Sequence, residues 1–223
     1  MLLYYITDRT AFPGTEAERR TALLHRIAEA ARAGVDYIQL REKDLSARLL
    51  EQLARESVHA VHDNSANTKL LINSRTDIAL ATGADGVHLP ADDLPASDVR
   101  ALWMKCGIRP AVIGVSAHSV AEVRLAASHG ANFAVLAPMF EKPHTVAPPL
   151  GLELLREACS DTRADNQVHH FSVLALGGVT LANAAACLAA RASGVAGIRL
   201  FQSGELRDTV LRLRALNVRE QQD

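Results

Sequence analysis

Short apolar runs that end in polar or glycine residues recur along the chain, and each is followed by a longer stretch with helical periodicity. The apolar runs predict strands at Leu3–Asp8, Tyr37–Glu42, Lys69–Ser74, Gly86–Pro90, Val112–Ala117, Phe133–Phe140, Ser172–Gly178 and Gly197–Gln202. The stretches between them predict helices at Glu16–Arg32, Ser46–Ala60, Arg75–Thr82, Ala96–Lys105, Val120–His129, Leu152–Cys159, Leu181–Arg191 and Glu205–Leu216. Strands that alternate with helices are typical of βαβ units in a parallel sheet.

The number of βα units points to a particular α/β fold. Eight units in 223 residues predict a single (β/α)8 TIM barrel over residues 1–223, with a frayed polar tail at 218–223. The alternative is a doubly wound open sheet, which commonly has a GxGxxG turn after its first strand. Thr7, Asp8 and Arg9 stand at that place here, so the sequence favours the barrel.

The composition of the chain indicates which kinds of binding partner and which compartment to expect. The formal net charge of -1 gives no electrostatic basis for binding nucleic acid or an anionic membrane, and no apolar stretch is long enough to span a bilayer. The first residues, MLLYYITDRT, lack the basic segment of a secretory signal. Cys106, Cys159 and Cys187 are odd in number and widely spaced, which predicts free thiols and a cytoplasmic protein.

Polar residues follow most of the predicted strands. In a TIM barrel the active site lies at the C-terminal ends of the strands, so these residues form a predicted site. They are Gln39, Arg41 and Lys43; Asn73, Ser74 and Arg75; His88, Asp92 and Asp93; Ser116 and His118; Gly177 and Gly178; and Arg199 and Gln202.

Two of these groups have a structural interpretation beside the functional one. The two-residue period of a strand places Gln39, Arg41 and Lys43 on one face, where two cations could bind pyrophosphate. The cations could equally pair with Glu42, Asp44 or other surface carboxylates. Asn73 or Ser74 could likewise cap the helix that follows rather than face a ligand.

The glycine pair Gly177–Gly178 closes a predicted strand and precedes a helix. This arrangement allows backbone N–H groups to contact a phosphate, and the usual phosphate site of a barrel lies after strands 7 and 8. A purely steric role for the two glycines is the alternative.

Seven short segments, in order and at barrel spacing, resemble the thiamine-phosphate synthase and TenI-like family. They are YYITDR at 4–9, YIQLREK at 37–43, LLINSRTDIAL at 70–80, GADGVHLPADD at 83–93, IGVSAHS at 113–119, LAPMF at 136–140 and LALGGV at 174–179. The resemblance implies a transferase that joins hydroxymethylpyrimidine diphosphate to thiazole phosphate and releases pyrophosphate. A homodimer is also expected.

The resemblance assigns roles to individual residues. Gln39, Arg41, Lys43 and Asn73 match the positions that hold the diphosphate, and Ser116 matches a serine that contacts the substrate. Asp93 matches a Mg²⁺ ligand, and Gly178, with Gly177, matches the thiazole-phosphate turn. Arg41, Lys43, Ser116 and His118 are the candidate catalytic residues.

Some positions depart from the family pattern. Ser74 stands where the synthase has the other aspartate ligand of Mg²⁺, which weakens binding of the ion, and Asp92 is a candidate substitute. Pro90–Ala91 replaces a Gly-Gln pair. The loop at 141–149 replaces one rich in Thr with a Lys, for which Lys142 or Thr145 could substitute. After the eighth strand, Arg199 and Phe201–Gln202 replace small residues.

Two other functions remain open. TenI-like tautomerases, which aromatise thiazole phosphate by moving a proton, also lack the aspartate and have Leu-Pro where Leu89–Pro90 stand here. Pro138 occupies the position of their catalytic histidine, so His118 and His144 are the candidate substitutes. The third possibility is a barrel that binds such ligands without turning them over.

Overall fold

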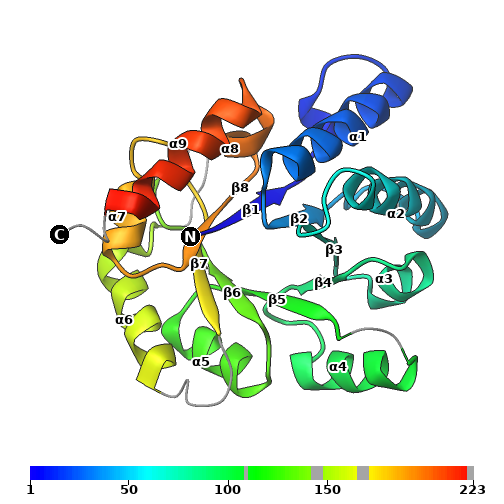
Figure 1. Ribbon diagram of the computed structural model, residues 1–223. Helices are drawn as coiled ribbons and strands as arrows, with labels where there is room; N and C mark the ends of the chain where they lie inside the picture. The colour runs from blue at the N-terminus through cyan, green and yellow to red at the C-terminus, as the bar shows by residue number, and fades with distance from the viewer. Residues whose placement is uncertain (108–109, 142–147, 165–170, 220–223) are drawn as a thin grey trace.

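A computed structural model describes residues 1–107, 110–141, 148–164 and 171–219 of the chain. Parallel strands form a closed barrel in the order β1 to β8, so the predicted (β/α)8 fold is confirmed. Figure 1 looks along the barrel, with the strands in the centre and the helices around them. The strands are β1 Leu2–Ile6, β2 Tyr37–Leu40, β3 Lys69–Asn73, β4 Gly86–Leu89, β5 Val112–Ala117, β6 Phe133–Leu136, β7 Ser172–Ala175 and β8 Gly194–Gly197.

The helices follow the strands around the outside of the barrel (Figure 1). Helix α1 begins in a capping box between Thr15 and Glu18 and ends at Gly34, whose φ of 84° is left-handed. The helices are η1 Arg9–Ala11, α1 Glu16–Ala33, α2 Ala47–His62, α3 Thr76–Thr82, α4 Ala96–Lys105, α5 Val120–Ser128, α6 Gly151–Ala164, α7 Ala184–Ala189, α8 Arg199–Gln202 and α9 Leu206–Arg219.

Alternation along the strands divides the apolar residues into two cores. One lies between the sheet and the helices, and residues such as Ile38 and Ile72 belong to it. The other fills the barrel and includes Tyr4 and Phe133, whose ring centroids are 5.2 Å apart. A Cβ on Gly114 would lie 2.4 Å from the Phe133 ring, so a glycine is required beside it.

The predicted eighth strand, Gly197–Gln202, is wrong. The strand is Gly194–Gly197, and Arg199–Gln202 form α8. Gly194, which precedes the predicted strand, belongs to the strand itself. A Cβ on Gly194 would lie 2.0 Å from the Leu2 carbonyl oxygen of β1, so glycine allows these strands to approach.

Other element boundaries differ by smaller amounts. Strands β6 and β7 end at Leu136 and Ala175, earlier than predicted. Helix α9 continues to Arg219, so the prediction of a frayed chain at 218 and 219 is wrong, and the last four residues of the expected tail lie outside the described part of the chain. No helix among the described residues is long and apolar enough to cross a membrane.

Candidate active site

The C-terminal rim of the barrel collects the predicted polar residues. Gln39 aligns with Leu71 across β2 and β3, and Asn73 aligns with His88 across β3 and β4. Gln39 is 1% exposed and shares the interior face with Tyr37, a neighbour of the barrel core. Ser116 near the end of β5 contacts His88. Four different strands therefore direct polar side chains to one end of the barrel interior.

The structure answers how Glu42 and Asp44 are paired. The Arg9 guanidinium donates to Asp44 through two nitrogens, at 2.7 and 2.6 Å, and to Glu42 Oε2 at 3.1 Å. The buried Glu42 also accepts from Thr7 Oγ1 at 2.6 Å and from the Arg9 amide. Arg9, which follows β1, thus forms ion pairs with both of the carboxylates that flank Lys43 in the sequence.

Arg41 and Lys43 consequently remain available on the rim. Neither forms an ion pair within the described residues, so the surface-pairing interpretation with Glu42 and Asp44 is wrong. The Arg41 amide donates to Thr7 Oγ1 at 3.0 Å, which holds the backbone at the end of β2. Arg41 is half-buried and Lys43 is exposed, so both cations can reach an anionic ligand.

A hydrogen-bonded chain leads from the barrel interior to the rim. The Tyr4 hydroxyl lies 3.1 Å from His88 Nδ1, and His88 Nε2 lies 2.9 Å from Ser116 Oγ. A neutral imidazole has one donor and one acceptor, so a proton on one nitrogen fixes the directions of both bonds. Tyr4 and His88 are buried, while Ser116 is half-buried and therefore presents the end of the chain to a ligand.

His88 is held in its neutral form. Burial first, and then the positive charge of Arg41, together lower its pKa from 6.5 to about 3. Burial also raises the pKa of Tyr4 well above its usual value. Near neutral pH the Tyr4–His88–Ser116 chain therefore carries no charge and can orient a ligand without repelling the cations beside it.

The side chains of Asn73 and Ser74 do not cap the helix that follows them. Helix α3 has Arg75 as its N-cap residue and no side-chain capping bond, so that interpretation is wrong. Instead Asn73 Nδ2 donates to Ser74 Oγ at 3.2 Å. Ser74 has a left-handed φ of 59°, a conformation that Asn and Asp adopt more readily than most residues. The backbone at position 74 therefore suits an aspartate equally well.

The carboxylate that the family resemblance assigns to a magnesium ion is Asp93. Asp93, which follows β4, is half-buried, and its Oδ1 accepts from the Leu94 amide at 2.8 Å. The described chain contains no group of three or more His, Cys, Asp or Glu side chains that could hold a metal. Mg²⁺ is often bound by one or two carboxylates together with water and substrate phosphates. The residues therefore fit an ion that is held by one carboxylate together with water and the phosphate groups of a bound ligand.

A cavity of about 790 Å³ lies beyond the ends of β7 and β8. Gly177 and Gly178 line it, with φ values of 99° and 69° that favour glycine. A Cβ on Gly178 would lie 2.8 Å from Phe140 Cβ, so this turn also packs closely against the segment after β6. The turn therefore has a steric requirement at Gly178 and also borders the cavity.

His118 lies just beyond β5 and is exposed. Its Nδ1 lies 2.9 Å from the Ala137 carbonyl oxygen, which can only accept, so Nδ1 carries a proton. Nε2 has no partner among the residues described. The other suggested substitutes, Lys142, His144 and Thr145, lie outside the described residues.

The sequence pattern named His88 at a strand end but gave it no role, and it missed Tyr4 and Arg9. Two-residue alternation from Gly86 could have placed His88 in the interior. The contact of Tyr4 with His88 joins residues 84 positions apart, and no local pattern reports it. The same holds for Arg9 and Glu42, which lie 33 positions apart.

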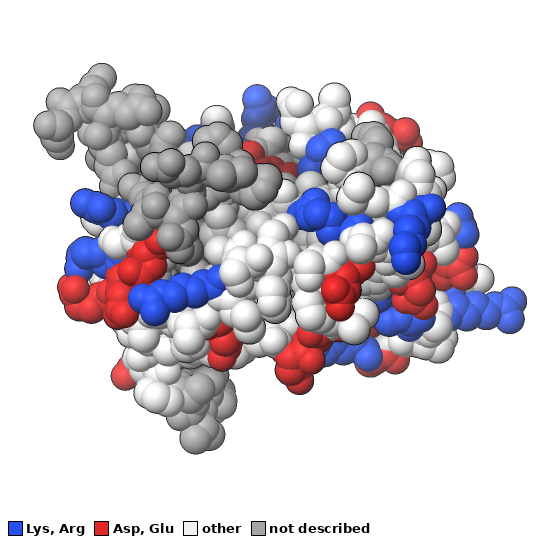
Figure 2. Space-filling view, turned by 90° about the horizontal axis from the view of Figure 1, so that it is seen from below, with Lys and Arg blue, Asp and Glu red and all other residues white. Residues whose placement is uncertain are grey.

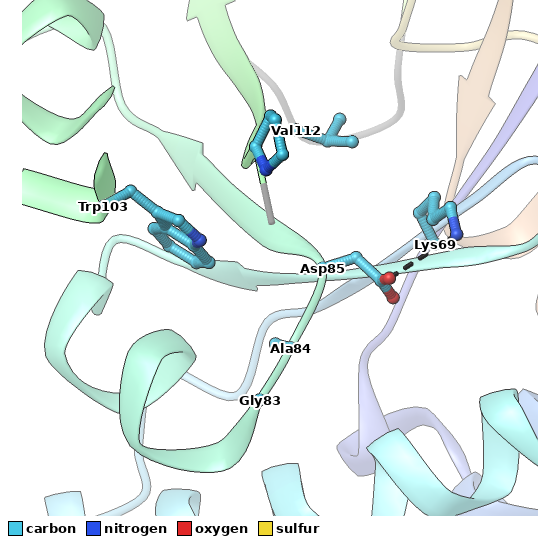
Figure 3. A pocket seen from close by; sticks show the side chains of 7 residues that line it. Lys69, Gly83, Ala84, Asp85, Trp103 and Val112 are labelled. Atoms are coloured by element: carbon cyan, nitrogen blue, oxygen red, sulfur yellow. Dashed lines mark ion pairs between the residues drawn. The ribbon is translucent and has the colours of Figure 1, made fainter. Parts of the chain in front are cut away.

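The opposite end of the barrel has a different character. A cavity of about 270 Å³ there is lined by residues that include Lys69, Asp85 and Trp103 (Figure 3). Asp85 accepts from the Leu70 amide at 3.0 Å and lies 3.6 Å from Lys69 Nζ. These contacts join β3 to the loop before β4, which indicates a structural role at the N-terminal end.

Surface charge gives no second candidate on the face in Figure 2. Lys and Arg side chains are interspersed there with Asp and Glu around a mostly uncharged middle. This pattern offers no electrostatic basis for a polyanion on that face. A closed parallel barrel with its polar residues at the C-terminal rim defines the class of (β/α)8-barrel enzymes.

Comparisons with known proteins agree with this class and give the family. A family model described as thiamine monophosphate synthase matches residues 3–201. The thiamine-phosphate synthase of Roseiflexus sp. strain RS-1 is 38% identical over 200 residues, 88% of this chain and 76% of that protein. The thiamine-phosphate synthase of Chloroflexus aurantiacus is 33% identical over 222 residues, 97% of this chain and 96% of that protein.

A solved structure gives the same answer. Thiamine phosphate pyrophosphorylase from Pyrococcus furiosus has a TM-score of 0.77 and 26% identity, and the match covers 98% of this chain and 96% of that one. The chain belongs to the thiamine monophosphate synthase family, and it is an enzyme of the transferase class.

Proposed function

We propose that this enzyme condenses hydroxymethylpyrimidine diphosphate with thiazole phosphate to give thiamine phosphate and pyrophosphate. The observation that carries the proposal is that Arg41 and Lys43 form no ion pair within the described ranges, since the neighbouring carboxylates of Glu42 and Asp44 are paired with Arg9. Two cations at the mouth of a barrel that lack an ion-pair partner among the described residues are suited to a ligand with several negative charges. Gln39 and Asn73 add amide groups at the same rim.

The bond changes are those of a substitution at carbon. The bond between the pyrimidine methylene carbon and the diphosphate oxygen breaks, and both electrons leave with pyrophosphate. The lone pair of the thiazole nitrogen then forms the new carbon–nitrogen bond. Arg41 and Lys43 stabilise the charge that develops on the leaving group, which is where preorganised cations contribute most.

Ser116 orients the pyrimidine substrate. Its hydroxyl is fixed by His88, which in turn is fixed by the buried Tyr4. Because His88 is neutral, it adds no positive charge next to the carbocation that forms at the pyrimidine carbon. Ser116 therefore positions the pyrimidine substrate, while Arg41 and Lys43 stabilise the negative charge of the leaving diphosphate.

Asp93 would hold a magnesium ion together with the substrate diphosphate, with Ser74 contributing a hydroxyl. A bound Mg²⁺ supplies neutralisation of phosphate charge. Since only one of these two residues is a carboxylate, binding of the ion depends strongly on the substrate itself. We place the phosphate of the thiazole at the Gly177–Gly178 turn, beside the cavity after β7 and β8.

The experiment that tests the condensation follows pyrophosphate release from the purified protein. Release should require both substrates and Mg²⁺, and omission of the thiazole phosphate should abolish it. Failure to exceed the rate without enzyme rejects the synthase reaction. Binding of either substrate in calorimetry without any turnover would identify a ligand-binding barrel instead.

His118 supports a second candidate, the thiazole tautomerase reaction. Its Nδ1 is fixed by the Ala137 carbonyl, which leaves Nε2 able to accept or donate a proton. Conversion of the non-aromatic thiazole tautomer without metal, lost in His118→Ala, would support this reaction. An unchanged rate in His118→Ala would exclude His118 from it.

A cytoplasmic homodimer that acts on small phosphorylated substrates completes the proposal. Odd, widely spaced cysteines and the net charge of -1 support the compartment and the class of partner. Light scattering of the purified protein tests the dimer, which predicts twice the chain mass of 24.0 kDa.

A further inference from the structure

The cavity beyond β7 and β8 contains a cation that the family resemblance does not predict. Arg199 lines this cavity at the first position of α8, where small residues are expected. Its side chain is exposed and forms no ion pair with any residue in the described ranges. Asp8 and Glu141 also line the cavity. Asp8 Oδ1 already accepts from Thr10.

Backbone donors border the same cavity. Gly177, Gly178 and Val179 lie between β7 and α7, and their amide N–H groups donate to no acceptor in the part of the chain that is described. Successive backbone N–H groups in a turn can form a concave site for an anion, and the positive φ values of Gly177 and Gly178 place these groups in such a turn. An arginine opposite such a turn adds the charge and the forked donors that suit a phosphate.

Helix α8 is fixed in place on its other side. Gln202 Nε2 donates to the Asp8 carbonyl oxygen, and Arg26 donates to the Gln202 carbonyl at 3.0 Å. Phe201 is fully buried, with its ring centroid 6.2 Å from that of Tyr5. Residues Phe201 and Gln202, which also replace small residues of the family, therefore anchor the helix and leave Arg199 at the cavity.

We propose that Arg199 binds the phosphate of the second substrate and selects the phosphorylated thiazole over its alcohol. The identity of this ligand rests on the proposed function, whereas the phosphate preference can be measured without turnover. Arg41 and Lys43 follow β2 and bind the diphosphate in the proposed function, whereas Arg199 lies after β8. Arg199 is therefore expected to contact the other substrate.

Calorimetry with thiazole phosphate and with the dephosphorylated alcohol tests the proposal on the full chain. We expect the phosphate form to bind more tightly to the wild type, and Arg199→Ser to weaken that form about tenfold, the loss expected for one charge-assisted contact. Affinity for the alcohol should stay the same. Arg199→Lys should recover part of the affinity, and Arg207→Ser, an exposed arginine of α9 outside the cavity lining, should behave as wild type.

Each alternative result is decisive. Equal losses for both ligands in Arg199→Ser would mean that Arg199 only supports the structure, and no loss for either would mean that it does not bind the phosphate; both overturn the proposal. A wild type that does not prefer the phosphate form overturns it as well. If the expected pattern appears while pyrophosphate release is absent, the phosphate site stands and the condensation reaction fails.

Discussion

The Arg9 guanidinium joins three acidic residues, and this arrangement decides which cations remain for a ligand. It contacts Glu16 at 2.6 Å in addition to Glu42 and Asp44. Hydrogen bonding to Arg9 lowers the pKa of Asp44, so that carboxylate stays ionised. Burial raises the pKa of Glu42, and the bonds from Thr7 and Arg9 oppose that rise. The two carboxylates beside Arg41 and Lys43 in the sequence are therefore satisfied.

Replacement of Arg41 should consequently affect catalysis more than stability. We expect Arg41→Ala to lower kcat/KM about 100-fold, because a cation that stabilises the leaving diphosphate is lost. Steady-state pyrophosphate release measures the effect. Arg48→Ala, an exposed arginine of α2, is the control and should retain the wild-type rate. Equal rates in the two variants would remove Arg41 from the active site.

The neutral state of His88 predicts a pH dependence of stability. Its pKa in the folded protein is about 3, below the ordinary 6.5, so the unfolded chain binds the extra proton as the pH falls below 6.5. The free energy of unfolding should therefore decrease there, by about 1.4 kcal/mol per pH unit from this residue. His88→Gln cannot titrate and should lack this component.

Urea unfolding at pH 7.5 and pH 5.5 measures that difference. The difference in the free energy of unfolding between wild type and His88→Gln should be smaller by about 1.4 kcal/mol at the lower pH. A gap that is the same at both pH values would show that His88 is not held neutral by its surroundings.

Residues whose position follows from strand periodicity were predictable, and residues defined by distant partners were not. Gln39 and Arg41 follow from two-residue alternation within one strand. The pairing of Glu42 with Arg9 requires β1 and β2 to be adjacent, which is known only once the barrel closes. Local sequence could not distinguish free cations from paired ones for this reason.

At the scale of elements, the turn after β7 combines backbone conformation with close packing. Gly178 is left-handed and also touches the segment after β6, whereas Gly83, at the end of α3, has a φ of 71° with nothing within 4 Å of a Cβ. An alanine at Gly83 would therefore lose stability only through the left-handed conformation. An alanine at Gly178 would lose stability through the conformation and through steric contact as well.

Gly83→Ala should destabilise the protein by about 1 kcal/mol, through the left-handed conformation alone. Gly178→Ala should cost about 2 to 3 kcal/mol, since the contacts with Phe140 and Glu141 are added, and it should also raise the KM for thiazole phosphate. Thermal unfolding and steady-state kinetics measure the two effects. Similar behaviour of both variants would contradict the packing and binding roles of Gly178.

The error at the eighth strand has a cause at the same scale. Residues 194–202 contain a glycine-rich segment followed by an apolar one, and the apolar segment reads as a strand. In the structure Gly194 begins the strand, because the Leu2 backbone of β1 lies too close for a side chain there, whereas a Cβ on Gly197 would meet the Leu200 side chain. Phe201 is apolar because it anchors α8. Strand assignment from hydrophobicity fails where neighbouring strands approach this closely.

For the whole molecule, closure of the barrel brings residues from β2, β3, β4, β5 and β7 to one rim. The fold was predictable because the alternation of strands and helices extends over the entire chain. The pattern of strands and helices does not determine the balance of charge at the rim. At that rim Ser74 stands in place of one aspartate of the family, and Asp93 is the carboxylate that matches a metal ligand.

Ser74→Asp tests that balance. Because position 74 already has a left-handed conformation that aspartate tolerates, the substitution should not disturb the fold. We expect the Mg²⁺ concentration for half-maximal pyrophosphate release to fall about tenfold or more, since a second carboxylate strengthens a site for a divalent cation. Ser74→Asn, which has no charge, is the control. An unchanged Mg²⁺ requirement in Ser74→Asp would place the ion elsewhere.

The most direct test of the proposed reaction is the ratio of its two products. Purified wild-type protein, given hydroxymethylpyrimidine diphosphate, thiazole phosphate and Mg²⁺, should form thiamine phosphate and pyrophosphate in equal amounts, quantified by chromatography from the same samples. Pyrophosphate without thiamine phosphate would mean that water, not the thiazole nitrogen, captures the pyrimidine. That result, or the absence of both products, would contradict the assignment of this rim to the condensation.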